Sequence, residues 1–555
     1  FSCLSISKII KNRFPKISMV FGGGSFTFEI ARQVVNKAPW VDGIVVGFGE
    51  KAMSDLVGAF SDGADLREIR IRGFVNAAFT EADQVDGGHS IFPSKKEILQ
   101  SYAYQPDCLS FPSIPEEIMT RPAVLPRVPV RSDSKGKIRV LAQQGCSYGR
   151  CTFCTQLYKR IFIPFDEGGL IRGIKTEIES KLSQDGVHAT NPIEIILDAD
   201  DHTDTFLEKL TDLVVSIDFK GRNVHLSFQY QVKRLNKRAL RALVRMNLHG
   251  IDSDRVHLNI ESLNPDTLKH MKKGHTPLKA IFSVKAFSDA GFSPICNYMM
   301  FFPLQCNISV SREVYFLEHI IHFFGMGRGI WRAISAGYGA NNLDEIYSRQ
   351  EDFNIVVKRN PNDIWLREAF GLDMPFNQWA FDWEERKSWS SIGTWAFRKM
   401  VSSLRRQSFR KFFYLIFGLV ALVFGQRSFR KRLQLYLYLN LVQFPGGPYT
   451  KKRFPIKRQA SWFYLKNDIL CKEYNSPLRS ESWQLPLTID EIKVFRFLYF
   501  PHSRDEVYGR FGNTIDKETI DGIVTRHLAL GSFIEDSGTL VSVVNDKASL
   551  NSWLS

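Results

Sequence analysis

Three of the eight cysteines, Cys146, Cys151 and Cys154, fall within nine residues, shortly after an apolar, strand-like run at 138–142. Clustered thiolates without a neighbouring histidine favour soft metals. Their spacing therefore suits either a zinc ion completed by a distant fourth ligand or an iron–sulfur cluster. A four-iron cluster normally takes four cysteines. Three would leave one iron with an open coordination site, at which a substrate or cofactor could bind directly.

The segment from 137 to 340 alternates strand-like and helix-like runs, which predicts parallel β–α units. The predicted strands are 138–142, 193–197, 224–228, 255–260 and 294–302, and the predicted helices are 169–182, 204–216, 237–246, 264–271 and 278–290. We therefore expect an α/β fold, a partial (β/α)6 TIM-like barrel. Its functional groups should lie at the carboxyl ends of the strands, as they do in complete barrels.

Polar residues follow three of these strands. Asp198 comes after the second strand, Gln229 and Gln231 after the third, and Glu261-Ser262 after the fourth. The acids between 198 and 204 also suit helix capping, and we assign Asp204 to that role. For Asp198 and Glu261 we favour ligand contacts, because strand ends carry such contacts in this architecture.

The cysteine loop, with Phe153 before its last cysteine, resembles the cluster loop of radical S-adenosylmethionine (radical SAM) enzymes. Their usual spacing is CxxxCxxC, and here the first gap is one residue longer. Residues 256–276 resemble the family's GxES…L..M.KGhT passage, and residues 298–303 its last barrel strand, NxxxGFP. Asn259 and Phe301 stand where that family usually has glycine. The matches follow one another in the family's order.

The resemblance implies that the three cysteines hold a [4Fe-4S] cluster whose fourth iron is chelated by S-adenosylmethionine. Reductive cleavage would give a 5′-deoxyadenosyl radical that removes a hydrogen from the substrate, with an electron donor protein as partner. The expected cofactor contacts are Glu261, Ser262, Asp198 and Gln231.

Residues 1–75 show a strand, a glycine turn, a helix and a second strand, which is the doubly wound pattern. Glycines at strand ends allow a ligand to approach closely, although tight turns explain them equally well. The stretches 21–25 and 41–50 resemble the last two strand ends of the cobalamin-binding domain found before some radical SAM domains, with Phe48 replacing an acid. The glycines implied as cobalamin contacts are Gly22, Gly23, Gly47 and Gly49.

This first domain is therefore expected to be a truncated, Rossmann-like cobalamin-binding domain. Its earlier strands are missing, so either the chain is a fragment or the domain is too incomplete to hold cobalamin. With cobalamin bound, the implied reaction is methylation of an unactivated carbon. The alternatives are a radical SAM enzyme that does not methylate and, in a different class, a membrane-surface binding protein with a structural metal site.

The structure expected of the other segments follows from their composition. The prolines of 76–136 predict an extended linker, and 341–480 is expected to be an aromatic and basic helical region. Residues 481–555 predict three helices and a hairpin, a winged-helix-like module. Acids at the start of its third helix would repel DNA phosphates, so nucleic acid is an unfavoured partner and a peptide or protein a better one. The overall order is similar to enzymes that modify ribosomally made peptides, so a peptide or small-molecule substrate is expected.

The formal charge of +15 is concentrated in one segment. Residues 386–467 hold 18 Lys and Arg and no acid, which leaves 15 − 18 = −3 for the rest. Within it, 412–424 is uncharged but shorter than the roughly 20 residues that cross a bilayer. The segment 408–432 therefore predicts contact with an anionic membrane surface, or a core helix with basic ends. Scattered single cysteines elsewhere indicate a reducing, cytoplasmic location.

Overall fold

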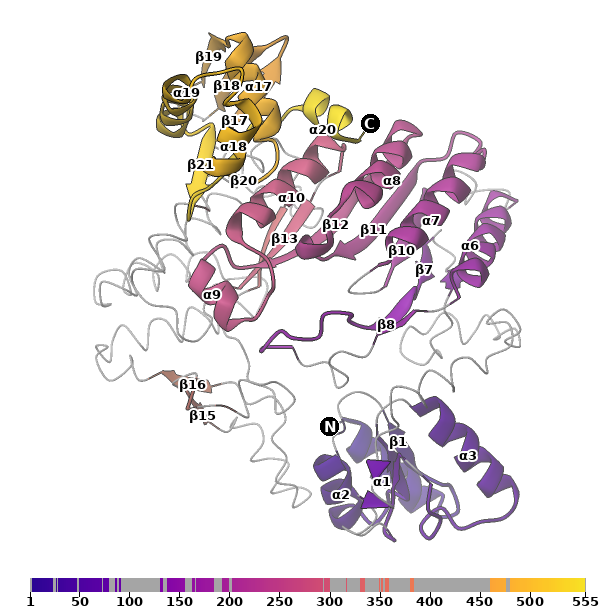
Figure 1. Ribbon diagram of the computed structural model, residues 1–555. Coiled ribbons are helices and arrows are strands. Elements are labelled where there is room, and N and C mark those ends of the chain that lie inside the picture. Colours follow the sequence, from indigo (N-terminus) through magenta and orange to yellow (C-terminus); the bar gives the residue numbers. More distant parts are fainter. Residues whose placement is uncertain are drawn as a thin grey trace. The chain divides into compact units, whose positions relative to one another are not determined.

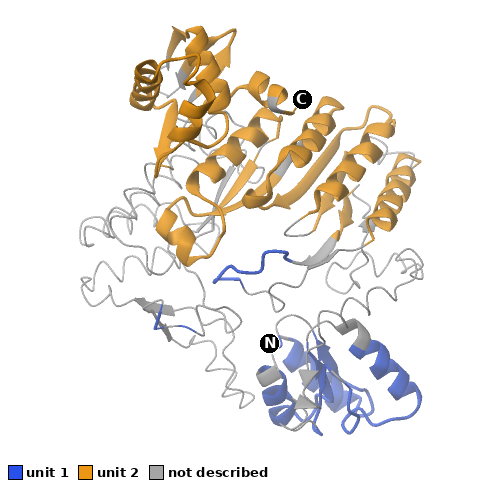
Figure 2. Ribbon diagram, viewed as in Figure 1, with its two compact units in different colours: residues 1–110, 145–163, 337–384 blue, residues 111–144, 164–336, 385–555 orange. Residues whose placement is uncertain are grey.

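The computed structural model describes three long parts of the chain and several short ones. With short internal gaps, these are 2–78, 85–90, 130–132, 137–154, 162–183, 192–198, 202–299, 316, 330–334, 349–358, 380–383, 460–475 and 480–554. They fall into two compact units (Figure 2). Unit 1 comprises Phe1–Ser110, Gly145–Ile163 and Gly337–Glu384, and unit 2 comprises Phe111–Gln144, Pro164–Ala336 and Glu385–Ser555. The predicted membrane segment 408–432 and most of 76–136 and 341–400 lie outside the described residues.

Among the described residues, a seven-stranded sheet forms the centre of unit 2 (Figure 1), in the order β14-β13-β12-β11-β10-β7-β6. Every neighbouring pair is parallel except β6 with β7. The strands are β6 (Val130–Ser132), β7 (Lys137–Val140), β10 (Ile193–Leu197), β11 (Val224–Tyr230), β12 (Ile251–Glu261), β13 (Pro294–Met299) and β14 (Ile330–Ile334). In the described residues this sheet is open and largely parallel. The parallel order is the one that the alternation of strands and helices predicts, and the finer expectation of a partial (β/α)6 barrel stays a prediction.

Helices cover one face of this sheet (Figure 1). They are α6 (Glu167–Leu182), α7 (Asp204–Ser216), α8 (Lys237–Leu248), the short α9 (Pro265–His270) and α10 (Pro277–Asp289), with a 3-10 turn η3 (Val232–Arg234). Residues of β11 alternate between buried and half-buried, because successive side chains of a strand point to opposite faces. Phe228 and Tyr230 pack on Phe287 of α10, whereas Ser227 and Gln229 lie on the other face.

All five strands and five helices predicted between 137 and 299 are present, with ends that differ by a few residues. The predicted last strand continues to 302, beyond the described part of β13. One detail is corrected. The hydroxyl of Thr203, not the carboxylate of Asp204, caps α7 by accepting from the Phe206 N–H at 3.0 Å. Asp204 instead occupies the first helical turn and accepts from Asn236 Nδ2 at 2.6 Å.

His202 is buried beside α7, with its ring centroid 6.2 Å from those of both Phe206 and Phe228. Burial, with the nearby Arg234 charge, lowers the pKa of His202 from 6.5 to about 3. Below pH 6.5, His202 takes up a proton in the unfolded chain but stays neutral in the folded chain. The free energy of unfolding therefore falls as the pH drops from about 6.5 towards 3.

We expect His202→Phe to make this acid dependence shallower, because the substituted side chain has no proton to take up. The measurement is the urea midpoint of unfolding between about pH 6.5 and pH 4.5, the window in which only the unfolded histidine titrates. His249→Gln, a change at an exposed position at the end of α8, is the control. An acid slope equal to that of the parent chain would show that His202 does not contribute.

Unit 1 contains a three-stranded sheet of β1 (Val20–Gly22), β2 (Gly43–Val45) and β3 (Phe74–Val75), with β1 parallel to β2 and β3 antiparallel to it. Its helices are α1 (Ser2–Arg13), α2 (Phe28–Lys37) and α3 (Gly49–Ser61). Ile44 packs with residues of α1 and α2, and Val45 with residues of α3. Since neighbouring strand residues point to opposite faces, helices cover both faces of the sheet, the arrangement that its sequence pattern predicts.

The remaining short strands form three pairs: β4 (Val85–Asp86) with β5 (His89–Ser90), β8 (Gln143–Gly145) with β9 (Phe162–Pro164), and β15 (Ile355–Lys358) with β16 (Ala380–Trp383). The last pair lies within 341–480, the segment expected to be helical. Residues 460–475 of the same segment are also strands, so the helical prediction is corrected there. The turn gives the physical reason. Asn467 and Asp468 both have positive φ, 50° and 62°, which suits a two-residue hairpin, and the strand before it, 460–466, contains three aromatic residues.

The C-terminal part of unit 2 begins with an antiparallel sheet of β17 (Ala460–Lys466), β18 (Ile469–Asn475) and β19 (Ser480–Pro486). It continues with α17 (Ile489–Phe497), β20 (His502–Ser503), α18 (Arg504–Phe511), α19 (Lys517–Leu530), β21 (Phe533–Asp536), β22 (Thr539–Ser542) and α20 (Lys547–Leu554). A capping box joins Thr488 and Glu491 at the start of α17, and the predicted hairpin turns at Ser537-Gly538. The three helices and the hairpin are therefore confirmed as elements.

Candidate cluster and cofactor site

The three clustered cysteines follow β7 and β8 along the chain and belong to unit 1. All three side chains are half-buried. Gly149, between the first two, has φ 53°, a left-handed conformation that glycine adopts at little cost. The Cys154 N–H donates to the Cys151 carbonyl at 3.2 Å, so these two thiols share one tight turn.

The donor chemistry of this loop fits an iron–sulfur cluster. Residues 146–154 contain three thiols and no Asp, Glu or His, so every metal donor that their side chains offer is sulfur, apart from weaker hydroxyls. In the described part of the chain, no group of three His, Cys, Asp or Glu side chains is arranged to hold a metal ion. Because metal sites commonly form together with local folding, we expect the loop to close when its thiolates bind.

Glu261 ends β12 in an unusual conformation, with φ 63° although it is not glycine. The residue is buried, and its side chain is 8% exposed. Lys273 Nζ lies 3.4 Å from Oε1, a long contact for an ion pair. Oε2 is buried and has no hydrogen-bond partner among the described residues. A buried carboxylate oxygen without a donor is costly, so this atom is poised to accept a hydrogen bond from a ligand.

The other residues expected at strand ends of unit 2 have different surroundings. The buried Ser262 hydroxyl accepts from the Asn264 N–H at 3.0 Å, a bond that shapes the start of α9. Asp198 accepts from Arg139 Nη1 at 3.0 and 3.1 Å and is 37% exposed, so its charge is already compensated. Gln231 is half-buried and precedes η3 without capping it.

A row of amide side chains crosses the face of the sheet that lies opposite the helices. Asn297 Nδ2 of β13 donates to Asn259 Oδ1 of β12 at 2.7 Å, and Asn259 Nδ2 donates to Gln229 Oε1 of β11 at 3.3 Å. Gln229 and Asn259 were noted separately from the sequence, whereas Asn297 was missed. A polar residue at alternate positions of three neighbouring apolar strands is the signal that could have revealed the row.

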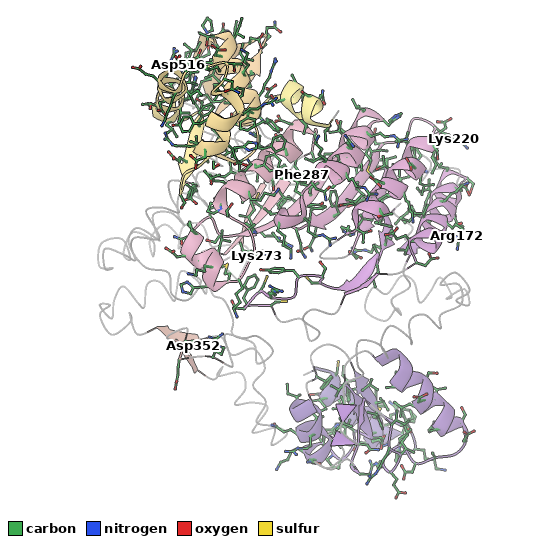
Figure 3. All side chains as sticks on the ribbon, in the orientation of Figure 1. Arg172, Lys220, Lys273, Phe287, Asp352 and Asp516 are labelled. Atoms are coloured by element: carbon green, nitrogen blue, oxygen red, sulfur yellow. The ribbon has the colours of Figure 1, made fainter. Side chains whose placement is uncertain are left out.

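Lys273 and His275 were also missed as site residues, although both lie in the 256–276 passage. Both are in the loop between α9 and α10 (Figure 3 labels Lys273). Burial lowers the pKa of His275 to about 3, helped by the charges of Lys273 and Lys233. His275 is therefore neutral at physiological pH, and its Nε2 has no hydrogen-bond partner among the described residues.

The glycines expected to contact cobalamin belong to unit 1. Gly22 ends β1, and a Cβ there would come no closer than 3.6 Å to Val45, so its surroundings do not require glycine. Gly49 is the first residue of α3. Gly23 and Gly47 lie outside the described residues. Since parallel strands share their carboxyl edge, Gly22 and the end of β2 lie at the same edge of this sheet.

Residues 140–305 match the sequence profile of the Radical SAM superfamily. The match begins at the end of β7 and includes the three cysteines, the amide row and Glu261. This part of the chain is a radical SAM domain, and the recognition made from the cysteine loop is confirmed. The superfamily implies a [4Fe-4S] cluster and S-adenosylmethionine as cofactors.

Among curated proteins, the chain is 22% identical over 320 residues to "Uncharacterized methyltransferase PH0819" of Pyrococcus horikoshii, a match that covers 58% of this chain and 62% of that protein. The chain thus spans less than two thirds of the length of this relative.

Among solved structures, the cobalamin-dependent S-adenosylmethionine radical enzyme OxsB with aqua-cobalamin bound is 16% identical, with a TM-score of 0.49, 79% of this chain covered and 65% of that one. The radical S-adenosylmethionine methyltransferase TsrM from Kitasatospora setae, with cobalamin and a [4Fe-4S] cluster bound, is 15% identical, with a TM-score of 0.39 and 57% and 56% covered.

No helix within the described residues is long and apolar enough to span a membrane. The segment 408–432, for which membrane-surface contact was predicted, lies outside those residues.

Proposed function

We propose that this chain is a radical SAM enzyme that methylates an unactivated carbon of a peptide or another natural product, with cobalamin as a further cofactor. The observation that carries the proposal is the radical SAM match at 140–305, which includes an all-sulfur loop of three cysteines. Further support comes from the resemblance of the first 75 residues to a cobalamin-binding domain and from the methyltransferase name of the archaeal relative.

Different residues of the chain have different proposed roles. Cys146, Cys151 and Cys154 are the proposed cluster ligands, and Glu261 is the proposed hydrogen-bond acceptor for a bound ligand. The half-buried amides of the row are suited to orient a polar group, since each can both donate and accept. When bound, the cluster supplies the electron for reductive cleavage of S-adenosylmethionine, and cobalamin the route for the methyl group.

Partners follow from this chemistry. The cluster must be reduced from outside, so an electron donor protein is proposed as a partner. Contact of 408–432 with an anionic membrane surface is a separate proposal, tested by sedimentation with anionic and neutral vesicles. Loss of anionic-vesicle binding on removing the basic residues of that segment is the expected result, and equal binding to both vesicle types would contradict it.

The test of the catalytic proposal is product formation after anaerobic reconstitution. With S-adenosylmethionine and dithionite, we expect 5′-deoxyadenosine to appear by mass spectrometry at a rate well above that of a cluster-free control. With a cobalamin supplement and a methyl-deuterated S-adenosylmethionine, candidate peptides should gain a labelled methyl group. 5′-Deoxyadenosine without any methylated product would favour a non-methylating radical SAM enzyme, and absence of both would contradict the proposal.

A further inference from the structure

The backbone makes a very tight turn at the end of β12. The Ser262 N–H donates to the Ile260 carbonyl at 2.8 Å, so the hydrogen bond closes over one residue, Glu261, with φ 63°. A bond from residue i to i+2 around a positive φ is the signature of the strained form of the γ-turn, which is rare. Such strain persists only where surrounding groups hold the backbone, and it gathers at ligand-binding positions.

Two side chains from the loop between α9 and α10 support this γ-turn. The His275 ring makes a hydrogen bond to the backbone of Ile260, and this bond acts to raise the His275 pKa. A bond that favours the protonated ring is one in which the ring donates, so the Ile260 carbonyl is the acceptor. Since Nε2 is the nitrogen without a partner among the described residues, the donor is Nδ1–H. The Ile260 carbonyl thus accepts two hydrogen bonds.

Lys273 contacts the side chain of the same turn: its Nζ lies 3.4 Å from Glu261 Oε1. Its ammonium and the His275 ring therefore hold different parts of the turn, one the carboxylate and the other the carbonyl before it. Neither satisfies Oε2, which remains buried without a described partner. The turn consequently presents one preoriented acceptor, and the donor it needs is not among the described residues.

We propose that His275 is a positioning residue: by holding the Ile260 carbonyl in the γ-turn, it orients Glu261 so that Oε2 accepts a hydrogen bond from an N–H or O–H group of the bound ligand. This inference rests on the proposed function for the identity of that ligand, which is S-adenosylmethionine or the substrate. The imidazole itself does not touch the ligand in this scheme.

Three variants test the role of the ring N–H. His275→Phe removes the donor and keeps a flat ring. His275→Asn places an amide N–H close to the position of Nδ1 and is the rescue. His270→Phe, at an exposed position at the end of α9, is the matched control. Circular dichroism and the unfolding midpoint establish that each variant is folded. If the phenylalanine variant does not fold, His275→Leu, which also lacks the ring N–H, takes its place.

The first readout is hydrogen exchange of the Ser262 amide, followed by mass spectrometry of peptides that span 256–264, and it needs no cofactor. We expect exchange about tenfold faster in His275→Phe, the equivalent of roughly one hydrogen bond, with parent-like exchange in His275→Asn and His270→Phe. Unchanged exchange in His275→Phe, or equal acceleration in the asparagine variant, would overturn the role of the ring N–H.

The second readout is ligand affinity of the reconstituted protein, measured by anaerobic equilibrium dialysis with S-adenosylmethionine, beside KM for the methylated substrate. We expect His275→Phe to raise either the S-adenosylmethionine Kd or the substrate KM about tenfold at unchanged iron content, with rescue by asparagine. Which constant changes identifies the source of the donor. Faster Ser262 exchange with both constants unchanged would overturn the link to a ligand.

Failure of the proposed function is distinguishable from failure of this inference. A parent chain that forms neither a cluster nor 5′-deoxyadenosine contradicts the proposed function, and the exchange readout still decides whether His275 holds the γ-turn. If the parent chain is catalytically active and the exchange of the Ser262 amide is the same in His275→Phe as in the parent, only the inference is contradicted.

Discussion

Replacing Cys151 with alanine is expected to abolish the broad visible absorption of the reconstituted protein and to lower 5′-deoxyadenosine formation by at least about 100-fold. Substitutions beside the metal ligands of other proteins already cost 10–100-fold, so loss of a ligand should cost more. With only two thiols left in the loop, no other described Asp, Glu or His is arranged with them to complete a site. Iron and acid-labile sulfide per chain measure the outcome directly.

Cys3→Ala is the matched control, because Cys3 is an exposed cysteine of α1, also in unit 1. The same reconstitution should give this variant the iron content and visible spectrum of the parent. If Cys151→Ala kept both, the loop would not be the cluster site. A colourless protein that holds about one zinc per chain would instead support the structural zinc alternative.

Replacing Lys285 with methionine is expected to lower the free energy of unfolding by about 3–5 kcal/mol. Lys285 of α10 is fully buried, and its ammonium lies 4.0 Å from the ring centroid of Tyr499. Nζ donates to the Tyr499 carbonyl at 2.8 Å and to the Ser542 carbonyl. Methionine fills a similar volume but leaves these two carbonyls, and the nearby buried Asp289, without a cation.

Asp289, one turn further along α10, completes the same buried contact. It accepts from the Tyr499 hydroxyl at 2.7 Å, from Asn545 Nδ2 at 2.8 Å and from the Asp546 N–H at 3.2 Å. The effects of Lys285→Met and Asp289→Asn should therefore be non-additive by about 0.5–3 kcal/mol in a double-mutant cycle. The physical reason is that each single change leaves the other group buried with an incomplete set of partners.

Equilibrium unfolding in urea measures both variants. Lys175→Met is the control, because Lys175 and Glu179 form an exposed pair at 3.7 Å whose loss should change stability by less than about 1 kcal/mol. A change of similar size at Lys285 would show that the contact between α10 and the C-terminal elements adds little to stability.

This contact also bears on the predicted winged-helix-like module. Its helices and hairpin were correctly predicted, because helix caps and turns depend on residues that act locally. That α10 anchors β22 and the start of α20 could not be predicted, because Lys285 and Ser542 are 257 positions apart. Around this anchor, the C-terminal elements pack against α10, one of the helices that cover the parallel sheet.

The sequence by itself determined the all-sulfur donor set of the cysteine loop, the alternation of strands and helices, and the strand ends at which Glu261 and Asp198 lie. These properties depend on residue type and on spacing along a few turns of chain. Only the tertiary structure decided that Arg139 neutralises Asp198 across 59 positions, and that Glu261 stands in a γ-turn held by a later loop. Both contacts depend on which distant segments pack together, and the spacing of residues within one segment does not determine that packing.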